Sequence, residues 1–143
     1  MSAVSEDAAR GTREWLAIEH DWLDARLAAI FLESTYGAFD EAVRDMATYR
    51  GECDAHIDHA RQRLFGALAG ADPRTVAAEA REWTANARDI RRAADAVESA
   101  LHAPGRAPIA AFEGLRGAVR RYQTQELRLL DLAHRLDQDP VVA

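Results

Sequence analysis

Apolar residues recur every three or four positions along most of this chain, which is the spacing of one buried face on an α-helix. Turn-forming residues interrupt the pattern at three places, Ser34–Gly37, Gly70–Pro73 and Ala103–Pro108. Asp72 directly before Pro73 also predicts a helix start, because Asp caps helices and proline suits the first helical position. The chain is therefore expected to consist of long helices joined by short turns.

The expected helices span residues 12–35, 39–69, 73–102 and 108–138. Short connections between long helices make neighbours antiparallel, so we predict an all-α fold, an antiparallel up-down-up-down four-helix bundle. A chain of 143 residues is the size of one domain, 1–143. We expect flexible tails over 1–11 and 139–143.

Three ionisable residues fall inside the apolar stripes: His20, His56 and Glu126. Tyr122 shares the face of Glu126, whereas His59 lies toward the flank of its helix and is expected to be half-buried. Antiparallel helices rise equally from their shared turn, by about 1.5 Å per residue. Counting from the turns places His20, His56 and Tyr122 at one level of the bundle, with Glu126 one turn away.

A polar layer in an apolar bundle is costly unless its members satisfy one another or a bound ion. One interpretation is a hydrogen-bonded trio in which Glu126 shares a proton with an imidazole. A second is a single metal ion held by His20, His56 and Glu126, the ligand set of mononuclear iron or zinc sites. A third is a small organic ligand in the space left by alanines at this level.

Charge and composition exclude several classes of function. The chain has 18 basic and 24 acidic residues and no basic stripe, which disfavours nucleic-acid binding. No apolar run approaches the roughly 18 residues of a membrane helix, and the amino terminus does not resemble a targeting signal. Cys53 is the only cysteine and is expected to be a buried core residue. We therefore expect a soluble, cytoplasmic protein that does not bind membranes.

The segment "EHDWLDARLAAI", with "HIDHARQRLFGAL" 36 residues later, resembles the hemerythrin-like (HHE cation-binding) domains. These are four-helix bundles that hold a non-haem di-iron centre. In that family the first helix gives a His, the second a His followed four residues later by a carboxylate, and the last two helices repeat the arrangement. The resemblance implies that His20 and His56 are metal ligands and that Glu126 is a carboxylate of the last helix.

Other ligand positions of the family are changed in this chain. The carboxylate four residues after His56 is replaced by Ala60, and the histidine of the third helix by Ala87. Tyr122, or Arg121 after a shift of one residue, stands at the histidine position of the last helix. A di-iron centre needs more ligands than remain. The resemblance therefore implies a reduced set of His20, His56 and Glu126, with His59 and Tyr122 peripheral.

Two functions follow. The first is a non-catalytic binding or regulatory module that has lost the di-iron site, has no cofactor, and acts through a protein partner or a small ligand. The second is a metalloprotein that binds a single iron or other divalent ion for sensing, storage or oxidation chemistry. No nucleophile motif, glycine-rich phosphate loop or Glu-x-x-His pair is present, so no reaction is assigned. Trp15, Ile18 and Trp22 widen the apolar face of the first helix, which suggests a homodimer.

Overall fold

The structure, a computed structural model, describes residues 3–103 and 108–138, and every regular element in these ranges is an α-helix. The helices are α1 (Ala3–Thr35), α2 (Phe39–Gly66), α3 (Pro73–Leu101) and α4 (Ile109–Gln138). The predicted bounds are close for α2, α3 and α4. Helix α1 begins earlier than predicted, so most of the expected tail over 1–11 is helical. The expected tail over 139–143 lies outside the described residues.

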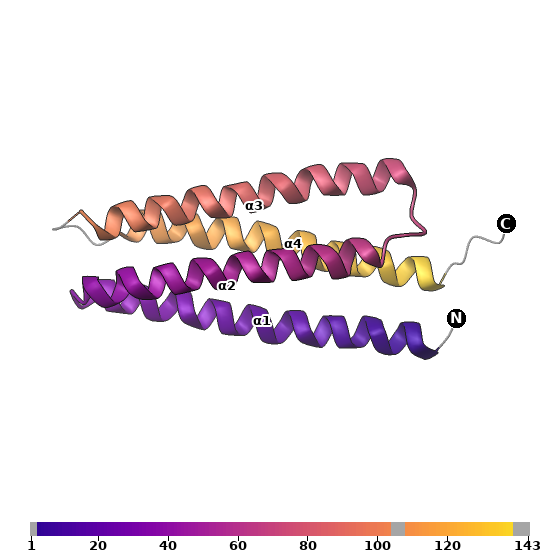
Figure 1. Cartoon of the computed structure of the whole chain (residues 1–143), viewed down its shortest axis with the longest axis horizontal. Helices are drawn as coiled ribbons and strands as arrows, with labels where there is room; N and C mark the ends of the chain where they lie inside the picture. The colour runs from indigo at the N-terminus through magenta and orange to yellow at the C-terminus, as the bar shows by residue number, and fades with distance from the viewer. Residues whose placement is uncertain (1–2, 104–107, 139–143) are drawn as a thin grey trace.

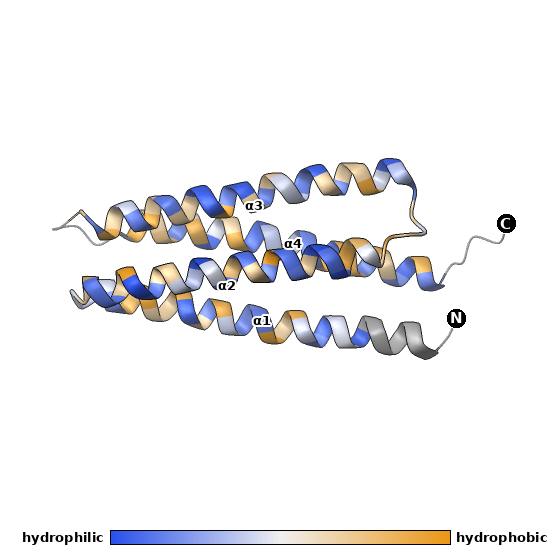
Figure 2. Ribbon diagram, viewed as in Figure 1, coloured by the Kyte–Doolittle hydropathy of each residue, from blue (hydrophilic) through white to orange (hydrophobic). Residues whose placement is uncertain are grey.

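The four helices alternate in direction, which confirms the predicted up-down-up-down bundle (Figure 1). Helix α1 packs mainly on α2, and α3 packs mainly on α4. The start of α1 and the end of α4 lie at the same end of the bundle as the connection between α2 and α3 (Figure 1). Hydrophilic and hydrophobic positions alternate along each helix (Figure 2), and no helix among the described residues carries an apolar stretch able to span a membrane.

The first two turns are formed by the residues that the sequence singled out, whereas residues 104–107 of the third lie outside the described residues. Gly37 follows α1 with a φ of 82°, a left-handed conformation that glycine adopts without steric cost. At the start of α3, the side chain of Asp72 accepts a hydrogen bond from the backbone N–H of Arg74, and Pro73 occupies the first turn. This confirms the predicted helix start and fixes where α3 begins relative to α2.

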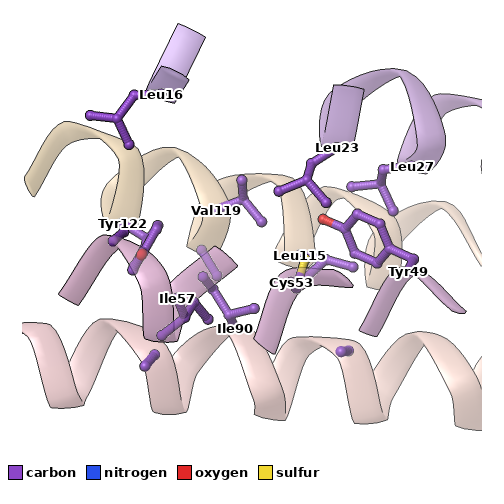
Figure 3. Packing of buried hydrophobic residues seen from close by; sticks show 14 of the residues in the cluster. Leu16, Leu23, Leu27, Tyr49, Cys53, Ile57, Ile90, Leu115, Val119 and Tyr122 are labelled. Atoms are coloured by element: carbon purple, nitrogen blue, oxygen red, sulfur yellow. The ribbon is translucent and has the colours of Figure 1, made fainter. Parts of the chain in front are cut away.

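Buried apolar side chains from all four helices form one core. Figure 3 shows part of it, where side chains from α1, α2, α3 and α4 converge: Leu23, Ile57, Ile90 and Val119. Cys53 is buried there, as predicted, and burial raises the pKa of its thiol to about 11. The thiol therefore stays protonated at neutral pH and behaves as a small apolar group.

A polar network joins α3 to α4. The buried side chain of Gln125 donates to the backbone carbonyl and the carboxylate of Glu79, and accepts from the amide of Asn86 at 2.8 Å. Arg128 donates to both carboxylate oxygens of Glu79, at 3.1 and 2.9 Å. These hydrogen bonds, foremost those from Arg128, lower the pKa of Glu79. Because Gln125 precedes Glu126, the network also fixes the position of Glu126 along the bundle.

We predict that Glu79→Gln lowers the free energy of unfolding at neutral pH by about 1 kcal/mol, since it removes a carboxylate paired with a half-exposed arginine. The pKa of Glu79 is lower in the folded chain, so the unfolded chain takes up the proton first. The stabilisation is therefore complete above the ordinary carboxyl pKa of 4.5 and is lost as the pH falls below it.

Urea unfolding of both proteins at neutral and acidic pH measures this difference. Glu14→Gln is the control, because Glu14 is exposed and makes no ion pair among the described residues. A difference between Glu79→Gln and the parent that stays constant down to acidic pH would contradict the prediction.

Candidate metal centre

Glu126 lies in the middle of the bundle with an exposed fraction of 0%. Its two carboxylate oxygens face two histidines: Oε1 is 2.9 Å from Nε2 of His20, and Oε2 is 2.9 Å from Nε2 of His56. The three residues come from α4, α1 and α2. The structure therefore brings together the three residues that the sequence predicted, and we call them the triad.

The two histidines differ in exposure. The side chain of His56 is 3% exposed and that of His20 is 14% exposed, so His20 lies at the edge of the core. Leu16 and Leu23, one turn before and one turn after His20, are buried and hold this stretch of α1 against the core. The triad is thus reached most directly from the side of α1.

The hydrogen bonds within the triad constrain its protons. A carboxylate accepts from two N–H groups, and Nδ1 of His56 is buried without a hydrogen-bond partner among the described residues. We therefore assign the Nε2–H tautomer to His56, because an unpaired N–H would cost more than a bare lone pair. A metal ion would need that nitrogen's lone pair, so binding an ion would displace this proton.

Aromatic rings surround the imidazole of His56. The ring of Trp15 stacks on it with the centroids 5.4 Å apart, and the ring of Tyr122 meets it edge-on at 6.0 Å. Trp83 packs against Tyr122 at 4.7 Å, and the guanidinium of Arg63 lies 4.5 Å from the ring centroid of Trp15. These contacts fix the orientation of the imidazole and shield the triad from water.

A small cavity adjoins the triad. Its volume is about 20 Å³, and its lining includes all three triad residues and Tyr122. That is room for about one water molecule, whereas sites for organic ligands measure roughly 300–1,000 Å³. An organic ligand at this level, the third interpretation of the sequence, therefore does not fit.

The hydroxyl of Tyr122 is buried and has no hydrogen-bond partner among the described residues. Burial raises the pKa of this phenol, and the nearby Glu126 raises it further, so Tyr122 is a neutral phenol. A buried hydroxyl without a partner is uncommon in proteins. Nδ1 of His56 and Nε1 of Trp83 are also buried without a partner, so three polar atoms near the triad are unpaired among the described residues.

The remaining family positions bring no further ligand. Ala60, Ala87 and Tyr122 are all buried and face the core. Arg121 is exposed. His59 is exposed, which agrees with a solvated residue on the flank of α2, and it is less buried than the half-buried position that its spacing indicated, because its side of the helix faces away from the core. Among the described residues, the triad is the one group of three ligand-type side chains placed to hold a metal ion.

Two features near this site were not predicted from the sequence: the buried Gln125 and the contact between Trp15 and Arg63. Gln125 lies three residues after Tyr122 and four before Leu129, so its helical spacing did indicate a buried position. The pairing of Trp15 with Arg63 carried no such signal, because it joins different helices and depends on side-chain rotamers.

Comparison of the chain with protein-family models, curated proteins and solved structures finds no match. The hemerythrin-like resemblance therefore stays a prediction.

We predict that Glu126→Gln lowers the free energy of unfolding by about 1–3 kcal/mol, because the amide NH₂ would face an imidazole N–H and leave buried donors unpaired. Thermal unfolding with a metal chelator present isolates this effect from any bound ion. Glu113→Gln is the control, since Glu113 is exposed on the same helix and should change stability by less than about 0.5 kcal/mol. Equal melting temperatures for both variants would contradict the assigned hydrogen bonds.

Proposed function

We propose that this protein is a helical-bundle module that binds one divalent transition-metal ion through His20, His56 and Glu126. The observation that carries the proposal is that their ligand atoms, one from each residue, all lie within 4.8 Å of one another. Two imidazoles and a carboxylate form an adequate set for iron or zinc. Each ligand comes from a different helix, so an ion would link α1, α2 and α4.

The cavity and the Tyr122 hydroxyl beside the triad are compatible with an ion that carries a water ligand. The cavity has room for a water molecule, and a water ligand on the ion would give the Tyr122 hydroxyl a hydrogen-bond partner.

The same geometry argues against a di-iron centre. A second ion would need ligands at positions where this chain has Ala60, Ala87 and Tyr122. The alanines offer no donor atom, and a neutral phenol is a poor ligand. The site therefore suits a single ion.

We infer a non-catalytic role for this ion, in sensing or storage. The triad is enclosed by aromatic rings, and its cavity admits no substrate larger than a water molecule. Ion binding would instead raise the free energy of unfolding, because an ion that binds only the folded chain stabilises that state. A cytoplasmic location is part of this proposal, since a lone cysteine fits a reducing compartment.

A second candidate is a regulatory module with no cofactor. It is favoured by the two hydrogen bonds at 2.9 Å, which already satisfy both oxygens of Glu126. In that case the triad contributes only to stability, and the protein acts through a partner at its surface.

Metal analysis distinguishes the two candidates. Protein purified without a histidine tag is incubated with ferrous iron or zinc, desalted and assayed for metal. We expect about one ion per chain, with the melting temperature raised by the ion. His56→Ala and Glu126→Gln should lose at least about tenfold in affinity, which is about 1.4 kcal/mol.

His59→Ala is the matched control, because His59 is exposed on the same helix and should leave metal content unchanged. Circular dichroism verifies that each variant is folded. If the parent binds no metal while His56→Ala and Glu126→Gln only lower the melting temperature, the metal proposal fails and the second candidate stands.

A further inference from the structure

Helix α1 carries a second apolar stripe on the side away from the core. Its members alternate at spacings of three and four residues and continue into the turn after α1: Trp15, Ile18, Trp22, Ala25, Ala29, Leu32 and Tyr36. We call these residues the outer seam. At about 100° per residue, the outer seam lies roughly opposite the stripe of Leu16, Leu23, Leu27 and Ile30 that faces the core.

The outer seam is exposed except at its first member, Trp15, which is partly buried and packs against the core. Ile18 is 70% exposed, Trp22 45%, Leu32 53% and Tyr36 84%. Single exposed hydrophobic residues are normal on proteins, but an aligned row of them marks an interaction surface. The other large exposed hydrophobic residues in the described part of the chain, Ile109 and Leu127, lie far apart on α4 and form no row.

The spacing of the outer seam indicates that its binding partner is a helix. Alternation of three and four residues is the repeat by which two helices pack side by side over a long distance. From Trp15 to Tyr36 the seam is about 32 Å long at 1.5 Å per residue. Ala25 and Ala29 occupy its middle, where small side chains allow a partner backbone to approach closely.

The negative charges beside the outer seam favour a partner helix that carries basic residues. Glu14 and Asp21 border one side and Glu19 the other, and none of them makes an ion pair among the described residues. Arg26, also on the border, is already held by Glu52 at 3.0 Å and lies over the ring of Trp22. A second copy of α1 packed parallel to the first would bring free carboxylates together, which is unfavourable.

We propose that the outer seam docks an amphipathic helix of a partner protein that carries Lys or Arg on both sides of its apolar stripe. The inference does not require an ion at the triad, because it rests on the exposed residues from Ile18 to Tyr36. Trp15 joins the two sites, however, since it belongs to the seam and its ring also stacks on His56.

Synthetic peptides test the proposal. The probe is a helical peptide of about three heptads with Leu at the core positions and Lys on both borders. One control peptide carries Glu in place of Lys, and another has the Lys composition in scrambled order. Calorimetric titration into the full chain should give micromolar binding by the probe, weakening as salt is added, and at least about tenfold weaker binding by either control, which is about 1.4 kcal/mol.

Variants of the chain locate the binding site. Ile18→Asp and Leu32→Asp should weaken probe binding at least about tenfold, whereas Leu127→Asp, on α4, should not. Circular dichroism verifies that each variant is folded. Equal binding of the scrambled or acidic peptide, or full binding by Ile18→Asp, would overturn the proposal. So would a dimer in sedimentation that Ile18→Asp abolishes, because the occupant would then be a second copy of the chain.

Discussion

A carboxylate buried in an apolar bundle needs partners, and that requirement organises the middle of this protein. Glu126 is fully enclosed and finds its partners in two histidines from different helices, each at 2.9 Å. Removing any one of the three would leave a buried polar group unpaired, at a cost of about 1–3 kcal/mol. The registers of α1, α2 and α4 are therefore coupled through one side chain, and the network around Gln125 adds α3 to them.

Most of the fold could be predicted from the sequence because it depends on local signals. Turn residues such as Gly37 and the pair of Asp72 and Pro73 mark where helices end and begin, and the bundle follows from their spacing. The members of the triad could be predicted too, because counting from the shared turns puts His20 and His56 at one level and Glu126 within one turn of it. Periodicity gives the direction in which a residue points but not its depth, which is why His59 was expected to be more buried than it is. The contact of Trp15 with Arg63 depends on rotamers that only the packed structure determines.

The atoms that hold the bundle together are the same atoms that would bind an ion. Nε2 of His56 donates to Glu126 in the structure, and it cannot do so while it is a metal ligand. Metal binding therefore competes with the two hydrogen bonds to Glu126. The net free energy of binding is the free energy of the ion–ligand bonds less the stabilisation that those two hydrogen bonds provide. The competition favours ions that bind imidazole strongly, such as zinc or ferrous iron, over calcium or magnesium, which prefer oxygen ligands.

Helix α1 contributes both to the buried triad and to the exposed outer seam. Its inner side supplies His20, the more exposed of the two histidines, and its outer side is the outer seam. Trp15 lies between the two sides, where its partly buried ring packs on His56 at the start of the seam. A helix docked on the seam would restrict the movement of α1 and so hold His20 and Trp15 in place. If an ion at the triad favours that same position of α1, linkage requires each ligand to strengthen binding of the other by the same factor.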